Sequence, residues 1–300
     1  MMRYPSQTNY FAGRGFTLVE LIMVIVITGI LGGMVAVFLK APIQQYMDVS
    51  RRAELTDIAD TALYRLASDI STAVPNSVRV AGCSVATPCV EFLPTKGDGN
   101  GGGRYRALAD SANALSDVLD FTMADGSFDI IGAPMVFAAA PNPDYIVLGS
   151  TQSNGAPAYD VSTTGVLRQY TGVAGAQANV AITPTQFPAF AKLASQRFDV
   201  VDGKQQAVTF SCEGTLGALN ANGDGQAKLL KHWGYGFNAA QAAPATLLGG
   251  SAMLADKLSG CVIDYNPSNQ RMGLLGVWLT LTSKNESVSL YHEIHVNNIP

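Results

Sequence analysis

The sequence predicts an α+β fold, in which one long N-terminal helix packs on an antiparallel β-sheet and a large loop-rich region is inserted between them. Three observations predict it: an apolar run at residues 16–39, an amphipathic stretch after it, and short alternating runs of apolar and polar residues toward the end of the chain. Helical faces and strand faces repeat with different periods, so these patterns predict different elements. The 300-residue length is ample for the core of one large domain.

The apolar run has the length and composition of a membrane-spanning helix. Residues 16–39 contain Glu20 as their only charge, and at ~1.5 Å per residue such a helix reaches about 36 Å, more than the ~30 Å hydrocarbon core of a bilayer. The preceding segment carries Arg3 and Arg14 and no acid. The positive-inside rule therefore predicts a single-pass membrane protein with a cytoplasmic N-terminus, whose residues 40–300 are exported.

Two simpler interpretations of this segment compete, and neither explains Glu20. An ordinary secretory signal would be cut after its apolar region, near Ala36 or Ala41. A plain membrane anchor would keep the run intact. A carboxylate in the apolar part of a helix costs about 2.5 to 3.5 kcal/mol at the bilayer centre unless it finds a partner. The glutamate therefore indicates a further role.

The residues around the start of the run carry a family resemblance. Gly15 is followed by Phe16, Thr17, Leu18, Val19 and Glu20 and then by the apolar helix, and this pattern resembles the type IV prepilin signal. The resemblance implies that residues 1–15 form a leader, which prepilin peptidase removes between Gly15 and Phe16, and that Phe16 is then N-methylated. It also implies that Glu20 meets the amino group of a neighbouring subunit during filament assembly.

The helix is expected to continue beyond the membrane, over residues 40–74. One face of the pattern is apolar at steps of three and four residues, at Leu55, Ile58, Ala59, Ala62, Leu63, Leu66, Ala67 and Ile70. Charged residues occupy the rest of the helical wheel. Pro42 is expected to bend the helix, and the helix should stop before Pro75.

The end of the chain, residues 206–300, is expected to form an antiparallel sheet. Strand-like runs lie at 206–212, 261–266, 272–283 and 287–296, and the last two are joined by "SKNE" in a hairpin pattern. A sheet with one apolar face needs a cover, and the amphipathic helix can provide it. Residues 75–205 are expected to be a variable elaboration, with short strand candidates in "DYIVLG" and "GVLRQY".

Four cysteines fit an oxidising compartment. Four cysteines allow three connectivities, but Cys83 and Cys89 flank a short proline-containing turn, so they can close locally and leave Cys212 to pair with Cys261. The alternative is a zinc site, yet no C-x-x-C pair occurs and the three histidines are not grouped with the cysteines.

Other candidate motifs give little support for chemistry, and no catalytic residue, cofactor or metal is expected. Gly97, Gly99 and Gly102 match G-x-G-x-x-G without the surrounding βαβ unit. The "NANGDG" segment resembles the start of a calcium loop, but Lys231 replaces the required glutamate. The histidines of "YHEIH" are three apart, and His232 is isolated. The net charge of −4 argues against a nucleic-acid partner.

The resemblance implies a structural role as a minor pilin, with prepilin peptidase, other major and minor pilins, an inner-membrane assembly platform and membrane lipid as partners. A head bulkier than the usual major pilin favours a minor component that primes assembly or lies at the tip. The later segments "RRAELTDIADTALYRLASDI", "LSGCVIDYNP", "GLLGVWLTLT" and "ESVSLYHEIHVNNIP" are similar to minor pilins of mannose-sensitive haemagglutinin (MSHA) pilus biogenesis.

Two alternatives remain open. One is a J-type minor pseudopilin of type II secretion, which shares the long helix but usually has a shorter head. The other is a tip adhesin that binds a sugar or a surface through tyrosines of the middle region, at Tyr105, Tyr145, Tyr159 and Tyr170. Tyrosines in strands are more often packing residues. An exported enzyme ranks behind both.

Overall fold

The structure, a computed structural model, describes residues 15–152, 156–193, 195–266 and 272–298. The chain divides into two compact units, residues 1–51 and 52–300, which are described separately. Most of the expected leader, residues 1–14 with Arg3 and Arg14, lies outside the described residues.

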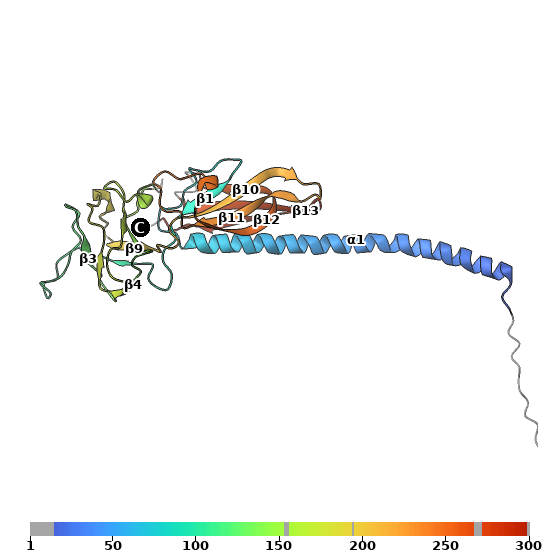
Figure 1. Cartoon of the computed structure of the whole chain (residues 1–300), viewed down its shortest axis with the longest axis horizontal. Helices are drawn as coiled ribbons and strands as arrows, with labels where there is room; N and C mark the ends of the chain where they lie inside the picture. Colours follow the sequence, from blue (N-terminus) through green and yellow to red (C-terminus); the bar gives the residue numbers. More distant parts are fainter. Residues whose placement is uncertain (1–14, 153–155, 194, 267–271, 299–300) are drawn as a thin grey trace, which may run out of the picture. The chain divides into compact units, whose positions relative to one another are not determined.

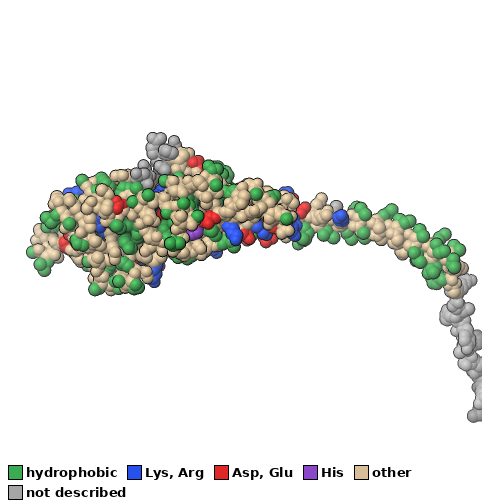
Figure 2. Space-filling model, turned by 45° about the horizontal axis from the view of Figure 1, so that its top comes forward, with side chains coloured by type: hydrophobic (Ala, Val, Ile, Leu, Met, Phe, Trp, Pro, Cys, Tyr) green, Lys and Arg blue, Asp and Glu red, His purple; other side chains and the backbone are tan. Residues whose placement is uncertain are grey.

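The first unit consists of the N-terminal part of helix α1 (Leu18–Ser71), which continues into the second unit. An 18-residue window of α1 has a mean hydropathy of 2.7 and no buried part, and by length and composition it is the one described helix that could cross a membrane. Figure 2 shows apolar side chains along this part of the helix. The helix starts two residues after Phe16 and continues through Pro42. The bend at Pro42 stays a prediction.

The second unit, called the head here, is built on a six-stranded antiparallel sheet (Figure 1). Its strands occur in the order β1 (Cys89–Phe92), β10 (Val208–Leu219), β11 (Gly225–Trp233), β12 (Gly250–Asp264), β13 (Leu274–Ser283) and β14 (Glu286–His295). The predicted hairpin is confirmed as β13 and β14, whereas β1, β11 and the first part of β12 were not predicted.

Strand β12 pairs with two different strands along its length. Its first part pairs with β11 up to Leu258, and its second part pairs with β13 from Leu258 to Asp264. Lys257, just before this change, has a φ of 56°, which is uncommon for a residue with a side chain. The register of both pairings shifts near Leu258, where β12 changes from one partner to the other.

The amphipathic part of α1 covers one face of this sheet, as the sequence predicts. Leu55, Leu66 and Ile70 are buried in one core with Phe210 and Leu279 of the sheet. Fully burying each large apolar side chain contributes roughly 1.5 to 3 kcal/mol. The remaining members of the predicted face are buried or partly buried in the same core: Ile58, Ala59, Ala62, Leu63 and Ala67. The α+β fold class is therefore confirmed.

Residues 97–205, called the insert lobe here, supply most of a second core, which Val74, Leu93 and Ala207 complete. A four-stranded sheet has the order β2 (Gly102–Arg104), β9 (Arg197–Val201), β5 (Tyr145–Leu148) and β6 (Leu167–Gln169). Two ribbons join β3 (Ser127–Asp129) to β8 (Asn179–Ala181) and β4 (Met135–Phe137) to β7 (Gly175–Gln177). The 3-10 turns are η1 (Ala156–Tyr159), η2 (Ala189–Ala191) and, in the segment before β12, η3 (Pro244–Thr246). The two strand candidates of this region are confirmed as β5 and β6.

Candidate processing and assembly site

The start of α1 is capped by the side chain of Thr17. The backbone N–H of Glu20 donates to Thr17 Oγ1 at 3.3 Å, and the N–H of Leu21 donates to the Thr17 carbonyl at 3.1 Å. Thr17 is therefore the N-cap residue and Glu20 is the third helical residue, the spacing of a capping box. The T-x-x-E pattern of this cap is visible in the sequence.

Glu20 lies in the first turn of α1, where a negative charge is stabilised by the helix dipole, by about 0.3 to 1 kcal/mol at an exposed site. Its side chain is exposed, and it makes no hydrogen bond or ion pair with any residue that the structure describes. Gly15 and Phe16 directly precede this turn and are exposed as well. An amine created at Phe16 would place a positive charge at the positive end of the helix dipole, which is unfavourable. A nearby carboxylate would offset this unfavourable interaction.

The helix that follows offers an apolar surface with its polar groups satisfied. Phe16 is 79% exposed, and large apolar side chains from Leu18 to Leu39 are also exposed among the described residues. The one hydroxyl group in the middle of this stretch, on Thr28, donates to the carbonyl of Val24 at 2.6 Å. Such bonding within the helix removes the cost of placing a hydroxyl in an apolar environment.

Comparison with known proteins identifies this segment. A family model described as the prokaryotic N-terminal methylation motif matches residues 12–36. No curated protein and no solved structure matches the chain significantly. The motif supports a type IV pilin or pseudopilin-type protein, and it implies processing by prepilin peptidase and assembly with other pilins. Pilins of this class are structural proteins, and the apolar helix is consistent with single-pass anchoring in a membrane.

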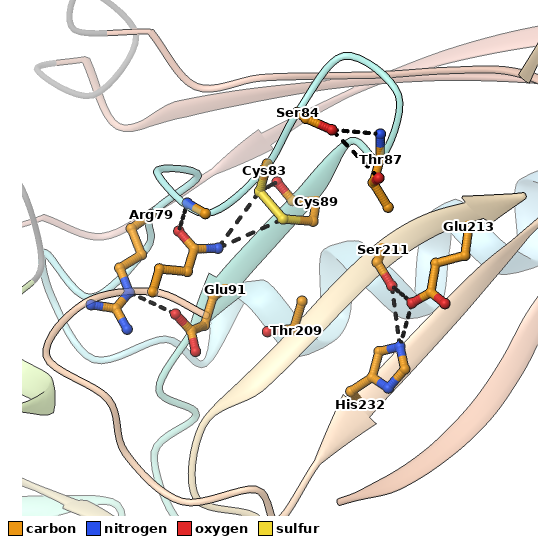
Figure 3. The surroundings of a disulfide bond; sticks show 12 residues. Arg79, Cys83, Ser84, Thr87, Cys89, Glu91, Thr209, Ser211, Glu213 and His232 are labelled. Atoms are coloured by element: carbon orange, nitrogen blue, oxygen red, sulfur yellow. Dashed lines mark hydrogen bonds and ion pairs between the residues drawn. A yellow bond between two sulfur atoms is a disulfide. The ribbon is translucent and has the colours of Figure 1, made fainter. Parts of the chain in front are cut away.

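The head contains two disulfides, Cys83–Cys89 and Cys212–Cys261. These are the pairs that the sequence predicts. Figure 3 shows the first of them beside strand β1. The side-chain amide of Gln241 lies 3.6 Å from Cys83 Sγ and accepts from the N–H of Gly82 at 3.0 Å, so the short loop is tied to the segment before β12.

Next to this disulfide lies a buried ion pair that joins several segments. Arg79 Nε donates to Glu91 Oε2 at 2.6 Å, and the two side chains are 4% and 1% exposed. The Arg79 guanidinium also donates to the carbonyls of Asn238 and Ala239, and it lies 3.6 Å from the ring centre of Tyr159. Burial raises the pKa of Glu91, and the charge of Arg79 opposes that shift. The pair thus connects β1 with the segment before β12 and with the ring of Tyr159.

A second polar cluster on the sheet was not predicted. His232 Nε2 lies 2.8 Å from Glu213 Oε1 and 3.2 Å from Ser211 Oγ (Figure 3). The arrangement does not activate Ser211 as a nucleophile, because its hydroxyl is fully buried and donates to Glu213 at 2.7 Å. The residues come from two strands, so only the pairing of β10 with β11 brings them together.

The remaining sequence motifs form turns. Gly97 and Gly99 lie in the turn before β2, and Gly102 is the first residue of β2. In "NANGDG", Asn220 Oδ1 accepts the N–H groups of Asn222 and Asp224 within the turn between β10 and β11. Asp224 Oδ1 in turn accepts from Ser283 and Lys284 of the next hairpin. Asn220 Oδ1 and Asp224 Oδ1 thus accept hydrogen bonds from the protein itself. His292 and His295 are exposed on β14.

The tyrosines considered for a sugar-binding surface lie inside the insert lobe. Tyr105, Tyr159 and Tyr170 are each 1% exposed. Tyr145 is half-buried and packs edge-on against Phe237 at 4.6 Å between ring centres. The prediction of an exposed stacking surface is therefore wrong for Tyr105, Tyr159 and Tyr170, whose rings fill the core of the lobe.

Proposed function

We propose that this protein is a minor pilin, which prepilin peptidase cuts between Gly15 and Phe16 and which then enters a type IV filament through α1. One observation carries the proposal. The methylation motif covers the start of an apolar helix, and Glu20 in the first turn of that helix has no side-chain partner among the described residues. An uncompensated carboxylate in an apolar helical core is costly. The Phe16 amine of a neighbouring subunit would supply the missing charge.

The proposed topology places the N-terminus in the cytoplasm and the head on the exported side. Two disulfides in the head support export to an oxidising compartment. The proposed domains are a leader at 1–15, a membrane and filament-core helix at 16–39 and an exported head region at 40–300, which is longer than the compact unit called the head above. Within this head region, 40–74 is the amphipathic helix, 75–205 the elaboration and 206–300 the sheet.

The proposed partners are prepilin peptidase, the other major and minor pilins of the filament, membrane lipid and an inner-membrane assembly platform. The folded insert lobe enlarges the head, which favours priming of assembly or a place at the tip over repetition in a tight helical array.

The finer assignment is to a filament of the MSHA type. It rests on the similarity of four segments to the MSHA-pilus biogenesis minor pilin MshO. A J-type minor pseudopilin of type II secretion is the second candidate, because it shares the long helix and the charge pattern that follows it. The neighbouring genes distinguish the two, since they encode either pilus or secretion components. A sugar-binding tip adhesin is third, because its four candidate tyrosines lie in the core or are half-buried.

The mass and N-terminus of the protein in purified filaments test the proposal. We expect a mature chain that begins at N-methylated Phe16, and we expect Gly15→Leu to leave the uncut precursor in the membrane. Gly29→Leu, at a glycine of the same helix with open space around it, is the control and should be cut normally. A mature chain that begins near residue 37 or 42 would instead identify an ordinary secretory signal.

A further inference from the structure

The two edges of the six-stranded sheet differ. At one edge, β1 is closed by the chain itself, because Arg79 and Glu91 exchange backbone hydrogen bonds of 2.8 and 2.9 Å, and the N–H of Val74 donates to the carbonyl of Leu93. At the other edge lies β14, which pairs with β13 and with no further strand that the structure describes. An exposed edge strand is a template on which another strand can add.

The edge of β14 is regular and open along its whole length. It pairs with β13 residue by residue, from Ser283 opposite Glu286 to Leu274 opposite His295, with no shift of register. In an antiparallel pair, alternate residues turn their backbone groups away from the partner. The turn between β13 and β14 has two residues, so Ser283 and Glu286 bond to each other and the outward-facing set begins at the next residue. The outward-facing residues are Ser287, Ser289, Tyr291, Glu293 and His295. Their backbone groups bond to no other described segment.

An exposed apolar row runs across the sheet and ends at this open edge. Val262 on β12 lies opposite Trp278 on β13, which lies opposite Tyr291 on β14. The three side chains are 54%, 41% and 46% exposed, and the Trp278 and Tyr291 rings are stacked with centres 4.1 Å apart. Gly276 leaves room for both rings, because a Cβ there would lie 3.1 Å from Trp278. The row therefore exposes apolar side chains up to the last strand of the sheet.

We propose that a second copy of this chain adds its β14 to this edge, antiparallel and centred on Tyr291. In that register Tyr291 faces its own symmetry mate, Ser289 faces Glu293, and Ser287 faces His295. No two carboxylates face each other, and each facing pair can exchange two backbone hydrogen bonds. The two apolar rows then join end to end across the dimer axis, which removes exposed aromatic surface from water.

Antiparallel pairing also determines which copies can meet. Residues 52–71 of α1 lie alongside the strands of the head (Figure 1), so the two-fold axis reverses this part of the helix in the partner. Subunits that point the same way in one filament cannot form the contact. If the proposed filament function holds, the contact joins heads that point in opposite directions, on two filaments or on two cells.

Light scattering on the isolated head, residues 52–300, tests the pairing. This unit contains both cores and both disulfides. We expect a monomer–dimer equilibrium that Ser289→Pro weakens at least about tenfold, because proline removes an outward N–H that β13 does not use and blocks the edge. Ser289→Ala keeps the N–H and should associate like the unchanged head. A head that stays monomeric at high concentration would overturn the proposal.

Cysteine cross-linking tests the register. Tyr291→Cys should form a disulfide with its own mate, because the two residues face each other. Ser289→Cys alone should not, since its mate lies four residues away along the strand, roughly 13 Å, and a disulfide needs Cα atoms within about 7 Å. A mixture of Ser289→Cys and Glu293→Cys heads should cross-link. Cross-linking of Ser289→Cys alone, or none by Tyr291→Cys, would contradict this pairing. These results do not depend on whether Gly15 is cleaved, so either proposal can fail alone.

Discussion

Glu20 links the chemistry of the N-terminus to assembly. Its backbone N–H completes the Thr17 cap, while its carboxylate has no partner among the described residues. The helix cap thus involves only the backbone of Glu20, and the carboxylate of Glu20 stays available for another partner. In a low-dielectric helical core, attraction between this charge and an amine is much stronger than in water.

We therefore expect Glu20→Gln to leave cleavage and membrane insertion intact and to reduce entry into the filament at least about tenfold, the factor that ~1.4 kcal/mol gives. Quantitative mass spectrometry of membranes and purified filaments measures both. Asp57→Asn, at an exposed acid of the same helix, is the control. Normal incorporation of the Gln protein would show that the charge pair is dispensable.

Asp199 makes the head less stable as the pH rises, whereas a carboxylate in an ion pair makes a protein more stable as the pH rises. It lies on β9 between Gly102 and Val147 of the neighbouring strands. Burial raises its pKa from 3.8 to about 6, and the charge of Arg197 opposes the shift. Between these values the folded head keeps a proton that the unfolded chain releases, so the free energy of unfolding falls as the pH rises.

We expect Asp199→Asn to remove this loss and to stabilise the head by about 1 to 3 kcal/mol at pH 7.5, with little effect at pH 4. Urea unfolding of the isolated head at several pH values measures it. Asp98→Asn, at an exposed acid in the turn before β2, should change little. Equal effects of Asp199→Asn at pH 4 and pH 7.5 would show that the charge is not the cause.

Among the elements, β10 and β12 are joined by a covalent bond although β11 lies between them in the sheet. Both cysteines, Cys212 and Cys261, are buried in the core beneath α1. The disulfide spans a sequence separation of 49, whereas Cys83–Cys89 spans only 6. Closing a longer loop removes more entropy from the unfolded chain.

We expect Cys212→Ala with Cys261→Ala to lower the free energy of unfolding by about 4 kcal/mol, and Cys83→Ala with Cys89→Ala by about 2 kcal/mol, on the loop-entropy model. Denaturant unfolding of the two double variants gives the comparison, and peptide mapping verifies the pairs in the unchanged head. Free thiols in that head, or a larger loss from the short loop, would contradict this account.

The elements that the sequence predicts are those with strong periodicity. Leu55 to Ile70 and the hairpin of β13 and β14 carry it clearly. Strand β11 does not, because its core positions include Gly225 and Ala227 and its run contains Lys228 and Lys231. The first part of β12 contains "LADKL", which fits a helix as well as a strand.

The candidate site was predictable where its residues are contiguous. Gly15, Phe16 and Glu20 form one local motif, and the Thr17 cap follows from its spacing to Glu20. The cluster of His232 with Ser211 was not predictable, because it depends on the register between two strands. Such a register is decided by the whole core and not by either strand alone.

For the whole head, the ion pair of Arg79 and Glu91 connects the main sheet with the insert lobe. Arg79 lies over the ring of Tyr159, whose hydroxyl donates to the carbonyl of Ser77 at 2.8 Å. Glu91 accepts from Tyr235 on its other oxygen at 2.9 Å. A buried charge left without its partner is strongly destabilising, so both parts of the head depend on this pair.

We expect Arg79→Met to lower the free energy of unfolding by about 3 to 5 kcal/mol. The double variant Arg79→Met with Glu91→Leu should recover much of this loss, because no isolated charge remains. Calorimetry gives the totals, and hydrogen exchange on β5 and β10 shows whether both parts are affected. A single variant as stable as the unchanged head would mean that the pair contributes nothing.

The pairing of Phe92 with Val208 joins two strands that are far apart in the sequence. The chain leaves the main sheet after β1 and returns to it only at β10, and the insert lobe lies between. Contacts so distant in sequence make folding slow, because the intervening loop must close before the contact forms. Most residues of the second core belong to the lobe, so we expect the lobe to fold first and to hold its two ends together. Once the lobe is folded, β1 and β10 leave it close together, so their pairing no longer requires closure of a long loop.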